Sequence, residues 1–208
     1  MGNTTCSGPV RSEGGFTSVS KSSTTGAFTT LSSISSTGVA SLDANTLATE
    51  AGTGITGGTG TIYRSSVIRT GGIIHTNILI DLTGLRSTAS GDIIGVNGTS
   101  NVCHIGQITA ARNGTILAGR MTCFEAPAGG DPDINVHSAT ESTGVEDGAI
   151  SDLTETLLVN AGDATTGSVV TFTGVPAADE FLYLTLGATT DADYTAGKLL
   201  IELFGYEA

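Results

Sequence analysis

The run Gly72–Leu82, GIIHTNILIDL, constrains the fold more than any other stretch of this chain. Ile74, Ile78 and Ile80 share one face of an extended strand, because side chains alternate with a period of two. The other face is largely polar, but Leu79 makes its centre apolar too, as in strands that lie inside a sheet. We therefore expect Gly72–Leu82 to be an interior β-strand.

Other short strand-like runs follow, separated by turn residues. The chain has 30 Gly, no Trp and 13% charged residues, a composition that favours strands and turns over helices. We predict an all-β fold, with a β-sandwich or jelly-roll-like body over residues 61–208 and an extended N-terminal arm over residues 1–60. The other expected strands are Thr61–Arg69, Asp92–Val96, Val102–Ala111, Thr115–Glu125, Ile134–His137, Ile150–Asn160, Ser168–Gly174, Glu180–Gly187 and Gly197–Tyr206.

The first 60 residues differ from the rest in composition. Ser and Thr fill 24 of these positions and Gly another 11, so the segment cannot build a core alone. It is either a disordered tail or an extended arm whose spaced apolar residues bind a partner, and order within an assembly would favour the arm. Ser41–Ala51 is its only helix-like stretch.

The Asn113-Gly114 dipeptide is the strongest hairpin signal in the sequence. A two-residue turn there would pair Val102–Ala111 with Thr115–Glu125, so we expect a hairpin. In that register Cys103 and Cys123 lie on opposite faces and cannot form a disulfide. The core side of the hairpin would carry His104, Ile108, Ala110, Leu117, Met121 and Cys123.

Cys103, Cys123, His104 and His137 are residue types that bind zinc. The hairpin would place His104 opposite Cys123, but Cys103 points away and no CxxC or HxxxH spacing is present. We therefore interpret the cysteines as buried thiols and His104 as a core histidine. Three cysteines make no disulfide framework, which favours reduced thiols in a protein made in a cytoplasm.

A Pro/Gly-rich acidic loop follows the predicted hairpin. Asp131 and Asp133 are its candidate cation ligands, because calcium binds six to eight oxygens that loop carboxylates and carbonyls can supply. No EF-hand spacing is present, and a solvated acidic loop is the alternative. We expect no other metal site and no cofactor.

Charge is unevenly distributed along the chain. Eight Lys and Arg stand against twenty Asp and Glu, and residues 71–208 alone carry a net charge of about −13. Such a body repels phosphate, so we expect no nucleic-acid partner. The start MGNTTCSGPV lacks the features of a signal peptide, and no apolar run is long enough for a membrane helix.

No catalytic motif is convincing. The Gly-x-Gly-x-x-Gly spacing of a dinucleotide-binding motif occurs at Gly52, Gly54 and Gly57. These residues lie in a Gly/Thr stretch, however, without the strand and helix that the motif requires. Paired carboxylates for glycoside hydrolysis are compatible with strands, yet few aromatic residues are available to stack on sugars. No Gly-x-Ser-x-Gly elbow is present. We predict that the chain is not an enzyme.

Several strings resemble uncharacterised virion structural proteins of marine and cyanobacterial tailed phages. The resemblance covers roughly residues 73–208. It lies in IDLTGL at Ile80–Leu85, IGQ at Ile105–Gln107, NGTILAGRMTCFEAPAGGDPDINVHSATESTGVEDGAISDLTET at Asn113–Thr156, VPAADEFLYLTLG at Val175–Gly187 and YTAGKLLIELFG at Tyr194–Gly205.

The resemblance implies a structural component of the virion and supplies no catalytic residues. With an acidic β body and a Ser/Thr/Gly-rich arm, we expect a capsid decoration (cement) protein, acting as a homotrimer on the outer surface of the major capsid protein shell. The alternative is a tail or fibre component, or a receptor- or glycan-binding β module of the virion.

Overall fold

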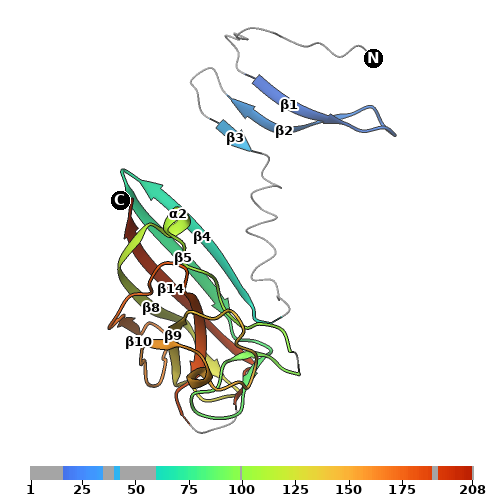
Figure 1. The fold of residues 1–208 in the computed structure, drawn as a ribbon. Coiled ribbons are helices and arrows are strands. Elements are labelled where there is room, and N and C mark those ends of the chain that lie inside the picture. The colour runs from blue at the N-terminus through green and yellow to red at the C-terminus, as the bar shows by residue number, and fades with distance from the viewer. Residues whose placement is uncertain (1–15, 35–39, 43–59, 99, 189–191, 208) are drawn as a thin grey trace. The chain divides into compact units, whose positions relative to one another are not determined.

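A computed structural model describes residues 16–34, 40–42, 60–98, 100–188 and 192–207 (Figure 1). The chain divides into two compact units, Met1–Gly54 and Ile55–Ala208. The fold is all-β, with several antiparallel sheets and only short helical turns among the described residues. This confirms the predicted fold class, while the jelly-roll topology stays a prediction.

The N-terminal unit contains a three-stranded antiparallel sheet in the order β1-β2-β3. Its strands are β1 (Phe16–Lys21), β2 (Phe28–Ile34) and β3 (Ala40–Leu42). Ser22 organises the turn after β1, because its hydroxyl accepts hydrogen bonds from the backbone of Thr24 and Thr25 at 3.3 and 3.2 Å. The arm thus contains local strand pairing that its composition did not reveal.

The helix expected over Ser41–Ala51 is not testable as a whole. Ser41 and Leu42 belong to strand β3, and residues 43–51 lie outside the described residues.

The body contains a five-stranded antiparallel sheet in the order β11-β8-β14-β5-β4, whose long strands run side by side in Figure 1. The expected strand Gly72–Leu82 is confirmed as β5, with neighbours on both sides. The strands are β4 (Tyr63–Thr70), β5 (Ile73–Asp81), β8 (Thr115–Ala128), β11 (Val169–Thr171) and β14 (Ala196–Tyr206).

A three-stranded sheet in the order β10-β9-β12 forms the second layer. Its strands are β9 (Ile134–Ala139), β10 (Glu155–Val159) and β12 (Phe181–Leu186), and the turn η1 (Ile150–Asp152) precedes β10. The strands β13 (Ala192–Asp193), β6 (Leu85–Ser87) and β7 (Gly95–Val96) form a third, small sheet, whose Leu85 and Val96 pack on the main core.

The main core lies between the two larger sheets, as in a β-sandwich. Ile78, Ile201 and Met121 sit side by side across β5, β14 and β8, and all three are buried. Leu182 and Leu184 of β12 belong to the same apolar cluster. Successive side chains of a strand point to opposite sides, so the apolar residues on the inward side of these strands are the ones buried in this core.

A second, smaller core covers the opposite face of the three-stranded sheet. Tyr183 and Ala139 point away from the main core, because they alternate with residues that face it. Ile93, Cys103 and Ile150 pack on them from the surrounding loops. These loops therefore act as a third layer of the body.

The hairpin expected at Asn113-Gly114 is wrong. Residues Ala110–Asn113 form a short helical turn, α2, and β8 pairs with β14 and β11 instead of with Val102–Ala111. The Thr109 hydroxyl accepts from Arg112 N at 3.2 Å, and Asn113 Oδ1 accepts from Thr109 N at 2.9 Å. The Asn113 side chain therefore closes a local turn, which competes with the two-residue hairpin.

The predicted core face of that hairpin was also partly wrong. Ile108, Met121 and Cys123 are buried as expected, but Leu117 is 65% exposed. The cause is a bulge: Phe204 of β14 pairs with Ala118 while the next residue pairs with Ile116, so Leu117 is skipped. An extra residue reverses which side chains face inward.

Candidate functional site

The acidic pair Asp131 and Asp133 was the only site predicted from sequence. Asp131 Oδ1 accepts from Asp133 N at 2.9 Å, so one carboxylate already caps the local turn. Burial, together with repulsion from Asp131 and Asp163, raises the pKa of Asp133 above its ordinary value. Within the described part of the chain, no group of three or more His, Cys, Asp or Glu could hold a metal ion. The cation site stays a prediction.

The zinc-type residues are dispersed over the fold. Cys103 belongs to the small core and Cys123 to the main core, and both are free thiols. Burial raises the pKa of Cys103 to about 11. His104 packs on the rings of Phe181 and Tyr183, with centroids 5.0 and 6.3 Å away, and burial lowers its pKa.

The expected pairing of His104 with Cys123 is therefore wrong, because it depended on the hairpin. His137 forms a separate contact: its Nδ1 lies 2.7 Å from Glu155 Oε2 and joins β9 to β10. The glycine motif at residues 52–57 lies outside the described residues.

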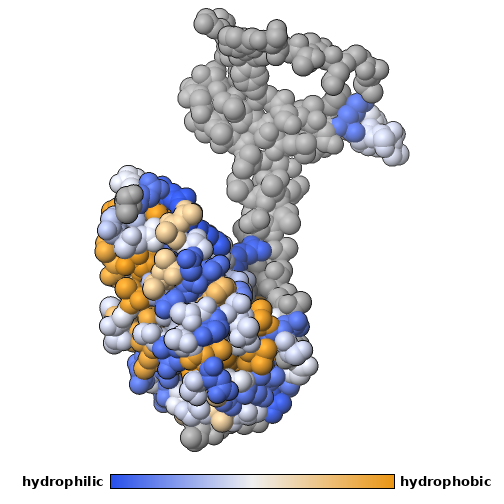
Figure 2. All heavy atoms as spheres, in the orientation of Figure 1, coloured by the Kyte–Doolittle hydropathy of each residue, from blue (hydrophilic) through white to orange (hydrophobic). Residues whose placement is uncertain are grey.

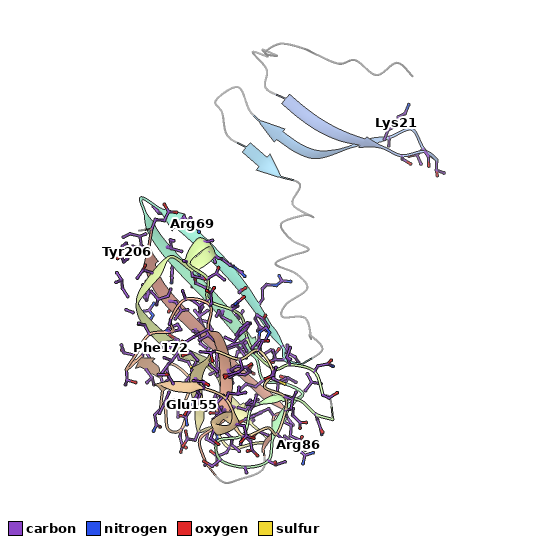
Figure 3. The ribbon with its side chains drawn as sticks, in the orientation of Figure 1. Lys21, Arg69, Arg86, Glu155, Phe172 and Tyr206 are labelled. Carbon is purple, nitrogen blue, oxygen red and sulfur yellow. The ribbon has the colours of Figure 1, made fainter. Side chains whose placement is uncertain are left out.

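Two small pockets flank α2. One, of about 390 Å³, is lined by Arg69 and Glu207, but Arg69 already donates to the Ala111 and Arg112 carbonyls at 2.6 and 2.9 Å. Figure 3 shows Arg69 and Tyr206 at the same end of the body. The other, of about 300 Å³, is mainly apolar and includes Val175. Orange residues gather in Figure 2 along the flank where Figure 1 draws α2 and β8.

The most distinctive surface is the outer face of the five-stranded sheet, the side turned away from the main core. Strand register defines it, since directly paired residues in antiparallel strands point to the same side. Glu202, for example, pairs with Asn77 and Arg120, and Arg120 pairs with Thr171. Phe124 has no direct partner in this register, but it is exposed and alternates with the buried Cys123, so it also faces outward. The outer face consists of Arg64, Ser66, Ile68, Thr70, Ile73, His75, Asn77, Leu79, Asp81, Thr115, Ala118, Arg120, Thr122, Phe124, Glu125, Val169, Thr171, Lys198, Leu200, Glu202, Phe204 and Tyr206.

A charged and aromatic cluster lies at the centre of the outer face. Arg120 Nε donates to Glu202 Oε2, and His75 Nε2 lies 3.3 Å from Glu202 Oε1. The His75 ring stacks on Phe204 at 4.7 Å, and the Arg120 guanidinium lies 5.8 Å from the centre of the same ring. The hydrogen bond from Arg120 holds the pKa of Glu202 below its ordinary value.

Glu202 is almost fully buried, with 7% of its surface exposed, although it lies on the outer side of the sheet. The Glu202 side chain is 9% exposed, whereas the Arg120 side chain that contacts it is 48% exposed, so the acidic partner is shielded from water while the basic partner is half in solvent. Sequence reading missed this cluster, because its members come from three strands far apart in the chain. The one indication in the sequence is in β14, where the charged residue Glu202 interrupts an apolar run.

No protein-family model, curated protein or solved structure matches the chain. None of the helices that the structure describes has the length and apolar character needed to cross a membrane. The resemblance to phage virion proteins therefore stays a prediction.

Proposed function

We propose that this chain is a structural protein of a tailed-phage virion, and that it decorates the outer surface of the capsid shell. The observation that carries the proposal is the division into two compact units, a body with a packed core and a Ser/Thr/Gly-rich N-terminal unit that contains a three-stranded sheet. A separate strand-forming segment suits binding along the surface of another protein, where sheet edges add strands and the body adds avidity.

The partner in this proposal is the major capsid protein, and the chain acts as a homotrimer by binding alone, without catalysis. The acidic character of the body, within a net charge of −12, supports a position outside the shell and away from the packaged genome. The resemblance of residues 73–208 to phage virion proteins supports the same role.

Counting copies per particle tests the role. We expect gel densitometry of purified virions to give many copies, in a fixed ratio to the major capsid protein, because decoration covers the whole shell. A few copies per particle would contradict decoration and support the alternative, a tail, fibre or receptor-binding component.

Deleting residues 1–55 tests the N-terminal unit as the anchor. We expect the remaining body to fold, since its core is complete within Ile55–Ala208, and to bind isolated capsid shells much more weakly than the full chain. Co-sedimentation with shells measures this. Equal binding by the truncated body would show that the anchor lies elsewhere.

A further inference from the structure

We propose that a second copy of this chain covers the outer face of the five-stranded sheet. The first observation is the concentration of exposed apolar side chains on that face. Ile68, Ile73 and Val169 are 55 to 61% exposed, Phe124 is 54% exposed and Tyr206 is 41% exposed. They come from all five strands of the sheet. The register places Ile68, Ile73 and Tyr206 toward one end of the face, and Phe124 and Val169 toward the other. Exposed apolar side chains gathered on one face mark an interaction site.

Charge identifies the partner. The outer face carries three basic and three acidic side chains, whereas the rest of the sequence from Thr61 onward carries fourteen acidic and three basic ones. Taken together, the rest of the body is acidic, so two copies that met through most of it would bring like charges together, which costs free energy. The outer face has equal numbers of basic and acidic side chains, so a second copy can approach it without net repulsion.

The charges on the outer face are already matched within one copy. Arg120 contacts Glu202, and Lys198 contacts Glu125 and pairs across the strands with Asp81. Covering the face would therefore leave no acidic group on it without a basic neighbour, which removes the main cost of burying charge. A strongly charged partner would gain little from a surface whose ion pairs are internally satisfied.

The area of the outer face agrees with a stable interface. Strands spaced about 4.8 Å apart, with the short β11 contributing three residues, β4 eight and the other strands the length of β5, give roughly 600 Å². A standard protein–protein interface buries about 800 Å² on each partner, and about 600 Å² is at the lower limit of its range. Face-to-face packing of two sheets, with side chains interdigitating about 10 Å apart, is a common arrangement. This inference goes beyond the virion role and does not depend on it.

Self-association of the full-length chain tests the proposal. Ile68→Glu on β4 and Val169→Glu on β11 place a charge on the outer face, at the two edge strands, where the monomer tolerates it. Sedimentation velocity and light scattering should give a mass above that of the monomer for the wild type. Each variant should weaken self-association roughly tenfold or more, because the new charge becomes buried at the interface.

Val102→Glu and Leu157→Glu are matched controls, since these apolar residues are exposed at 44% and 39% but lie outside the outer face. Both controls should assemble like the wild type. Circular dichroism and thermal melting check that each variant is folded, and Ile73→Glu replaces any outer-face variant that is not.

A wild type that stays monomeric up to its highest soluble concentration overturns the proposal. So do folded outer-face variants that assemble as tightly as the wild type, which would place the contact elsewhere, for instance in the N-terminal unit. Loss of the wild-type oligomer in folded outer-face variants, while both control variants still assemble, supports it. Failure to bind capsid shells would refute the proposed function while leaving this result intact.

Discussion

Replacing Tyr183 with Phe isolates the contribution of one buried hydroxyl to the stability of the body. Tyr183 is fully buried in the small core. Its hydroxyl donates to the Glu141 carbonyl at 2.8 Å and accepts from Gly144 N at 3.3 Å, which fixes the loop that covers that core. The substitution keeps the ring and its packing and removes both hydrogen bonds.

The expected cost follows from these two bonds. A buried polar group left without a partner costs about 1–3 kcal/mol, and the longer bond to Gly144 contributes less than the shorter one. We therefore expect Tyr183→Phe to lower the free energy of unfolding by about 2 kcal/mol. For a unit of this size, that corresponds to a decrease in Tm of roughly 4–8 °C.

Differential scanning calorimetry and urea denaturation of the full chain measure the change, with two tyrosine variants for comparison. Tyr194 is also buried but donates a single hydrogen bond, to the Asp131 carbonyl at 2.9 Å, so Tyr194→Phe should cost less. The Tyr63 hydroxyl forms no hydrogen bond within the described residues, and Tyr63→Phe should be nearly neutral. A Tm for Tyr183→Phe equal to that of Tyr63→Phe would refute the reasoning.

Four further predictions concern the body. Gly95→Ala should lower Tm strongly, because its Cβ would lie 2.3 Å from Cys103 Sγ, whereas Gly174→Ala, whose Cβ would meet nothing closer than 3.8 Å, should melt like the wild type. Glu202 has a pKa below its ordinary value, so its stabilising contribution is present at neutral pH and lost as the pH falls through the folded-state pKa. Between about pH 5 and 3, the Tm of Glu202→Gln should therefore fall less with decreasing pH than the Tm of the wild type. An equal fall in Tm for both proteins would contradict this. Mass-spectrometric mapping at pH 8 should find Cys103 unlabelled by a thiol reagent until denaturant is added, because burial raises its pKa to about 11; rapid native labelling would show that the small core opens. Calcium and EDTA should give the same Tm, since the Asp131–Asp133 pair is not part of a group of three or more His, Cys, Asp or Glu that could hold a metal among the described residues, and an increase with calcium would support the cation site.

The sequence predicted those parts of the fold that depend on local alternation. β5 and β14 are read correctly because their inward positions are mostly apolar, with Ile74, Ile78 and Ile80 in β5 and Leu199, Ile201 and Leu203 in β14. The bulge at Leu117 interrupts this alternation in β8, and no feature of the local sequence marks it. Reading the alternation of β8 without the bulge places Leu117 on the wrong face.

The Asn113-Gly114 prediction failed because a tertiary contact outweighed a local preference. Asn113 Nδ2 donates to Thr76 Oγ1 at 2.9 Å, in a buried contact with β5, a strand 37 residues earlier in the chain. The cluster on the outer face could not be predicted for a related reason, because only the order of the strands in the sheet brings His75, Arg120 and Glu202 together. Residue types can be read from sequence, but their neighbours across strands cannot.

Strand order also has a consequence for how the body is made. β14 is the last of the described strands to leave the ribosome, yet it lies in the middle of the five-stranded sheet and joins β5 to β8. Until it emerges, β4 with β5 and β8 with β11 are separate pairs, each with an exposed edge and an uncovered apolar side. The five-stranded sheet is therefore expected to close only after β14 has emerged, and the nascent chain that still lacks β14 is the form most exposed to aggregation.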